Sequence, residues 1–116
     1  MQKVVDSFPE HKFVQIGMPT DPLLNNVEDC RGKYSLRQVA GILYNARLFF
    51  GPVGGMMHLA RSVNCPAVIL LPSFETVSWY YSGYHYITSS PRCTKCDAFQ
   101  RNPSHCIEKH TCINIS

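Results

Sequence analysis

Three glycines and a histidine follow one hydrophobic run and have the chemistry of an anion site. The run is Arg47-Leu-Phe-Phe50, and Gly51-Pro-Val-Gly-Gly-Met-Met-His58 comes directly after it. Glycine permits positive φ and close backbone approach, and the free amides at a helix N-terminus favour a phosphate. His58 would lie in the first turn of that helix and donate to a phosphate oxygen or shape the loop. A tight strand-to-helix turn, with the histidine bonded to a neighbouring carbonyl, explains the same residues, so both interpretations stay open.

A second group with ligand chemistry lies in the last quarter of the chain. Its members are Cys93, Cys96, Cys106 and Cys112. The C-x-x-C spacing of the first pair lets two thiolates hold one tetrahedral metal ion. The second pair, or His105 or His110, would complete the shell, and four soft ligands in a reducing compartment favour zinc. Two disulfides, which an oxidising setting would favour, and four reduced thiols are the alternatives. In either bonded form the role is structural.

The elements that must position these residues alternate between helix and strand. Helices are expected over residues 1–8, 35–45 and 54–64, and strands over 13–16, 27–30, 47–50, 66–71 and 84–88. Ser35-x-x-Gln38 is a capping box that marks a helix start. The continuous apolar run over 66–71 is typical of a parallel strand covered on both faces, and residues 75–80 form a short helix or a loop. The pattern predicts an α/β fold with a parallel sheet and flanking helices.

Composition limits the function classes. The chain has 116 residues, 45% of them hydrophobic and 16% charged, which suits one globular domain and argues against disorder. The net charge is +3 and no Lys/Arg run exceeds two residues, so we expect no nucleic-acid partner. No run is long enough to span a bilayer, and the N-terminus lacks the apolar region of a signal peptide. We therefore expect a cytoplasmic protein.

Four segments, taken in order, resemble the C-terminal half of glycosyltransferase family 9, the ADP-heptose:lipopolysaccharide heptosyltransferases and their relatives. They are Arg31-Gly-Lys-Tyr-Ser-Leu-Arg-Gln-Val-Ala40, Ala46-Arg-Leu-Phe-Phe-Gly51, Gly55-Met-Met-His-Leu-Ala60 and Cys65-Pro-Ala-Val-Ile-Leu70. The cysteine-bearing tail also fits, because many members end in C-x-x-C…C…C. The resemblance runs from about Phe8 to Cys112, and the G-x-x-H-L-A core combined with the upstream R-G-x-x-S-L segment is fairly specific.

The resemblance implies a Rossmann-like domain that is the C-terminal, donor-binding half of a GT-B fold. The whole enzyme would transfer a sugar, with inversion, from an ADP-heptose-like nucleotide to lipopolysaccharide core or another glycan. An N-terminal acceptor-binding domain would supply the catalytic carboxylate, so no catalytic residue is assigned to this chain. No cofactor is required for catalysis, since no D-x-D segment is present. The acceptor would be a glycolipid at a membrane surface, with the protein peripheral at the inner membrane.

Donor-binding residues are carried over from the family by position. Gly54, Gly55 and Met56 would offer backbone amides to the diphosphate, with His58 supporting the loop. The residues near the base and ribose would be Lys33, Tyr34, Ser35 and Leu36. Gly17 would border the donor-binding cleft. Gly51 and Met57 complete the expected set. We expect the donor-binding domain to cover residues 1–90 and the tail, residues 91–116, to pack on it.

One departure from the family supports a different function. The family has an acidic residue followed by Ser or Thr where this chain has Val53-Gly54. The alternative is therefore a non-catalytic, degenerate Rossmann-like interaction module with a zinc or disulfide tail. Asp21, Glu28 and Asp29 are expected to be solvated loop charges, although Asp21 would alternatively reach a ribose hydroxyl. The aromatic residues of Trp79-Tyr80-Tyr81-x-x-Tyr84-x-Tyr86 are expected to cover a sheet face rather than to stack on a sugar.

Overall fold

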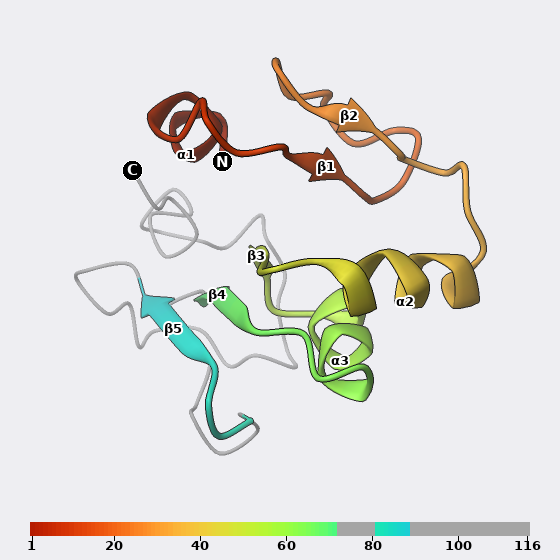
Figure 1. Ribbon diagram of the computed structural model, residues 1–116, viewed down its shortest axis with the longest axis vertical. Coiled ribbons are helices and arrows are strands. Elements are labelled where there is room, and N and C mark those ends of the chain that lie inside the picture. The colour runs from red at the N-terminus through yellow and green to blue at the C-terminus, as the bar shows by residue number, and fades with distance from the viewer. Residues whose placement is uncertain (72–80, 89–116) are drawn as a thin grey trace, which may run out of the picture. The chain divides into compact units, whose positions relative to one another are not determined.

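Two parallel sheets and three helices make up the described part of the protein (Figure 1). The structure is a computed structural model that describes residues 1–71 and 81–88. The chain is divided into two compact units, Met1–Ile42 and Leu43–Ser116.

The first unit is built around a short parallel pair of strands. Helix α1 (Gln2–Ser7) precedes β1 (Val14–Gln15), which pairs with β2 (Glu28–Asp29) so that Val14 lies opposite Glu28. The side chain of Gln15 holds the connection between the two strands, because it donates to the Pro22 carbonyl at 2.9 Å and accepts from the Leu24 amide at 2.9 Å. These bonds hold the long loop between β1 and β2 in place, although the two strands pair over only two residues each.

Helix α2 (Leu36–Asn45) begins where the capping box predicts. The Ser35 amide donates to Gln38 Oε1 at 3.0 Å, and the Gln38 amide donates to Ser35 Oγ at 3.4 Å. Two amides of the first turn are therefore satisfied by side chains, which is the function of this motif. Val39 and Leu43, four residues apart on one face, are buried.

The second unit is a three-stranded parallel sheet with a crossover helix. Strands β3 (Phe49–Pro52), β4 (Ala67–Leu71) and β5 (His85–Thr88) lie in the order β3-β4-β5, and α3 (Gly55–Ser62) connects the first two. The central strand alternates: Ala67, Ile69 and Leu71 are buried, whereas Val68 and Leu70 are half-buried. The continuous apolar run predicted a strand covered on both faces, and the structure shows one face buried and the other half-buried. The core of this unit contains Phe49, Met57, Ala60, Ile69 and Leu71.

The described residues form a small α/β fold whose strands are parallel and lie in two sheets flanked by helices. The predicted α/β class is confirmed. The expected segment over 75–80, the boundary between residues 90 and 91 and the tail itself lie outside the described residues. Over residues 1–71 and 81–88, no helix combines the length and apolar character needed to cross a membrane.

Candidate functional site

The turn between β3 and α3 begins later than the sequence predicts. Strand pairing continues past Phe50 through Gly51 and Pro52, which lie opposite Ile69 and Leu70. The Val53 amide then donates to the Leu70 carbonyl at 3.2 Å. Gly51 is buried, and a Cβ on it would lie 2.7 Å from the ring of Phe49. Gly51 is therefore a strand residue that makes room for an aromatic side chain, and the loop proper starts at Val53.

Gly54 and Gly55 form an open turn at the start of α3. Gly54 has φ 154° and ψ −167°, a conformation that is essentially restricted to glycine. A Cβ on either glycine would meet no atom within 4 Å, and both residues are exposed. Side chains of the described residues thus leave the space at this turn empty, as a backbone site for a ligand requires.

Three backbone amides at this turn lack a partner among residues 1–71 and 81–88. The first helical bonds of α3 run from the Met57 and His58 amides to the Gly54 carbonyl, at 3.0 and 3.4 Å. Within the described part of the chain, the amides of Gly54, Gly55 and Met56 have no hydrogen-bond acceptor. Unpaired amides at a helix N-terminus, together with the helix dipole, form a favourable environment for an anion.

Two other predicted residues of this turn have different surroundings. The side chain of Met57 is only 1% exposed and belongs to the core of the second unit, so it stabilises α3 rather than facing a ligand. Val53 is half-buried and contributes neither charge nor hydroxyl. The favourable potential for an anion at this turn therefore comes from the backbone amides and the helix dipole.

His58 is exposed and forms a side-chain contact that the sequence did not indicate. Its Nδ1 lies 2.8 Å from the hydroxyl of Tyr81, with the two rings edge to face at 5.7 Å. The guanidinium carbon of Arg61 lies 5.4 Å from the centroid of the same tyrosine ring. Helical spacing would indicate that His58 and Arg61 share a face, but sequence patterns carry no signal for the partner 23 residues away.

The remaining predicted donor residues lie in the first unit, around the start of α2. Tyr34 and Leu36 are 44% and 67% exposed, and the Ser35 hydroxyl is engaged with Gln38 Oε1 at 3.0 Å. The Lys33 ammonium donates to the Asp29 carbonyl. Gly17 has φ 150°, and its carbonyl accepts from the Gly32 amide at 2.9 Å. The predicted site residues are thus divided between the two units, five in the first and six in the second.

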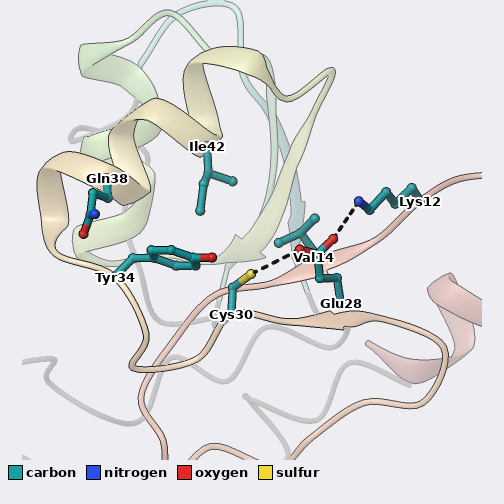
Figure 2. Close-up of a pocket in the computed structure, with 7 residues that line it drawn as sticks. All are labelled: Lys12, Val14, Glu28, Cys30, Tyr34, Gln38 and Ile42. Atoms are coloured by element: carbon teal, nitrogen blue, oxygen red, sulfur yellow. Dashed lines mark hydrogen bonds and ion pairs between the residues drawn. The ribbon is translucent and has the colours of Figure 1, made fainter.

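An open pocket of about 330 Å³ lies within the first unit, beside Tyr34 (Figure 2). It is lined by Lys12, Val14, Glu28, Cys30, Tyr34, Gln38 and Ile42. Figure 2 shows the Tyr34 ring between Gln38 and Cys30, with Ile42 projecting from α2 toward the same space. The volume lies in the lower part of the range for small-molecule sites, and the mixture of apolar walls with a few polar groups is typical of them.

Both residues of β2 form charged pairs, and the pair of Glu28 with Lys12 lines this pocket. Lys12 Nζ lies 2.6 Å from Glu28 Oε2, and this hydrogen bond lowers the pKa of Glu28 and raises the pKa of Lys12. The carboxylate of Asp29, the second residue of β2, accepts from Arg31 Nε and Nη2 at 2.8 and 3.0 Å. That bidentate pair holds the pKa of Asp29 well below its usual range.

The three acids expected as solvated loop charges therefore have defined positions. Glu28 and Asp29 lie on β2 and are ion-paired. Asp21 lies in a loop, where its carboxylate accepts from the Met18 amide at 2.7 Å. Each carboxylate is thus engaged by a neighbouring group of the chain.

The four tail cysteines, Cys93, Cys96, Cys106 and Cys112, lie outside the described residues. Cys30 and Cys65 are free thiols, 5% and 2% exposed, as expected for small apolar side chains. Burial raises the pKa of Cys65. Over residues 1–71 and 81–88, no group of three or more His, Cys, Asp or Glu side chains is arranged to hold a metal ion. No protein-family model, curated protein or solved structure matches the chain.

Proposed function

We propose that this chain is the donor-binding part of a glycosyltransferase similar to family 9, and that the amides at the start of α3 bind the diphosphate of a nucleotide-sugar. The observation that carries the proposal is an open glycine turn at which three amides, on Gly54, Gly55 and Met56, have no acceptor among the described residues. A diphosphate gains negative charge as the sugar leaves, so donors fixed in advance stabilise the transition state more than the ground state.

The pocket beside Tyr34 supports a nucleoside site in the first unit. Its apolar walls suit a base or ribose, and the exposed Tyr34 ring offers a flat surface for stacking. The Lys12–Glu28 pair provides a hydrogen-bond acceptor for a hydroxyl group. The resemblance sets Tyr34 near the base, and the pocket is consistent with that role. By analogy with the family, the chain would be the Rossmann-like, C-terminal half of a GT-B enzyme.

In this proposal the chain contributes binding and leaving-group stabilisation, while an N-terminal acceptor domain contributes the general base. The acceptor would be lipopolysaccharide core or another glycan, and the sugar would be transferred with inversion. The 116 residues alone would bind nucleotide weakly, with a Kd of about 1 mM or somewhat tighter, and would not turn over.

The second candidate is a non-catalytic interaction module. It is favoured by Val53, which places a half-buried apolar side chain where the family has an acidic residue. This candidate predicts no saturable binding of ADP or of an ADP-sugar, since the same fold would serve only to present a surface.

Calorimetric titration of the chain with ADP separates the two candidates when it includes the variants Gly55→Asp and Gly55→Asn. A side chain at Gly55 has open space, and neither residue disturbs a core contact. A carboxylate within about 4 Å of a phosphate costs about 1 kcal/mol per unit charge in water and more in a lower dielectric. For two phosphate charges this predicts that Gly55→Asp loses at least ~30-fold in affinity for ADP.

Gly55→Asn is the matched control, because asparagine has the shape of aspartate without its charge. Its Kd for ADP should lie within about threefold of the Kd of the original chain. Equal loss in both variants, or no saturable binding by the original chain at millimolar ADP, contradicts the donor proposal. The second outcome supports the interaction module.

A further inference from the structure

The hydroxyl of Tyr81 is held in place by a chain of contacts that begins at the central strand. Tyr86 lies on β5, opposite Ile69 of β4. The Tyr81 amide donates to Tyr86 Oη at 2.8 Å, and Tyr86 Oη in turn donates to the Tyr81 carbonyl at 3.1 Å. Both backbone polar groups of Tyr81 are therefore fixed by one side chain that is itself part of the sheet.

Ring contacts orient the Tyr81 side chain as well. Its ring packs edge to face against Tyr84 at 5.9 Å and against His58 at 5.7 Å, and Arg61 covers it at 5.4 Å. Such arrangements of aromatic rings and of a cation over a ring face are mutually favourable. The hydroxyl therefore meets His58 Nδ1 in a constrained geometry.

We infer that Tyr81 is a positioning residue that keeps the imidazole of His58 in the tautomer with its proton on Nε2. In a neutral imidazole one nitrogen donates and the other accepts. The sp² nitrogen Nδ1 is a stronger acceptor than a phenol oxygen, whose lone pair is delocalised into its ring. A guanidinium at the ring face draws electron density further from that oxygen. Tyr81 O–H therefore donates to Nδ1, and Nε2–H remains as the donor.

The effect of this tautomer on ligand binding rests on the proposed function. Side chains on a helix lean toward its N-terminus, and the amide of His58 already bonds to the Gly54 carbonyl. An Nε2–H donor on the exposed His58 suits a phosphate oxygen, whereas an unprotonated Nε2 would repel it. Tyr81 would thus determine whether His58 attracts or repels an anion at the turn.

The test combines NMR of the free chain with ADP titration. Long-range ¹H–¹⁵N spectra of ¹⁵N-labelled protein, recorded in mildly alkaline buffer, distinguish protonated from unprotonated ring nitrogens. The original chain should show an unprotonated Nδ1 and a protonated Nε2 for His58. Tyr81→Phe keeps the ring contacts and removes the hydroxyl, so the two tautomers should mix and ADP affinity should fall about threefold to tenfold.

Tyr84→Phe is the matched control. Within the described residues its hydroxyl is buried without a hydrogen-bond partner, so its removal should change neither the His58 spectrum nor ADP affinity. A protonated Nδ1 in the original chain, or an unchanged His58 spectrum in Tyr81→Phe, overturns the inference. The NMR result requires no nucleotide, so failure of ADP to bind rejects the donor proposal separately. Normal ADP affinity in Tyr81→Phe rejects the positioning role while leaving the donor proposal intact.

Discussion

Alanine at Gly54 and alanine at Gly55 should change stability in opposite directions, although the two residues are adjacent. Neither new Cβ meets an atom within 4 Å, so steric overlap plays no part at either position. Gly54 has φ 154° and ψ −167°, and holding another residue there costs about 1–3 kcal/mol. Gly55 is the first residue of α3, where alanine restricts the unfolded chain and stabilises by about 0.4–1 kcal/mol.

Urea unfolding followed by far-UV circular dichroism measures both effects. With a slope of about 2 kcal/mol/M, a loss of about 2 kcal/mol lowers the midpoint of Gly54→Ala by about 1 M, while the midpoint of Gly55→Ala rises by a few tenths. Native-state hydrogen exchange of the β4 amides gives a local readout of the same unit. A Gly54→Ala chain as stable as the original would refute the described turn, and with it the arrangement of free amides on which the donor proposal depends.

Two further predictions concern the first unit. Ser35→Ala removes the cap of α2 and should cost about 1 kcal/mol in urea unfolding, whereas Ser35→Asp should retain most of the stability; equal losses would mean that the cap contributes nothing. Arg31 and Lys12 lower the pKa values of Asp29 and Glu28 in the folded chain. The stabilisation by these pairs is therefore fully present when the pH is above the ordinary carboxyl pKa values of 3.8 and 4.5, and it is lost as the pH falls below them. Unfolding midpoints measured from about pH 6 down to about pH 3 should fall more steeply for the original chain than for Asp29→Asn. An identical slope would contradict this assignment.

Local sequence signals predicted most of the helices and strands. The capping box at Ser35 placed the start of α2 correctly because its two hydrogen bonds join residues three apart. The alternation of strand, helix and strand over residues 47–71 predicted the β3-α3-β4 unit for a similar reason, since the pattern of each element lies within a few residues.

Features that depend on distant pairing were less visible in the sequence. Strand β3 continues through Gly51 and Pro52 because β4 offers partners for them, and propensity alone argued for a turn at a Gly-Pro pair. The division of the strands between two sheets likewise depends on which strands meet in space.

The candidate site shows the same division between local and distant signals. Glycine at positions 54 and 55 predicts an open turn from the residue type itself, and the structure describes one. The burial of Met57 and the contact between His58 and Tyr81 are set by packing between α3 and the sheet and by the residues before β5. The glycine motif therefore predicts the position of the backbone amides better than it predicts the contacts of the neighbouring side chains.

The bond from the Val53 amide to the Leu70 carbonyl has a consequence for the thermodynamics of association. It ties the first residue of the glycine turn to the middle strand of the sheet, so the turn enters any complex with little remaining freedom to lose. Ligand capture should therefore carry a small ordering penalty for the polypeptide. If the turn binds a ligand as proposed, loosening the sheet at the buried Ile69 would weaken binding by giving the turn more freedom to lose.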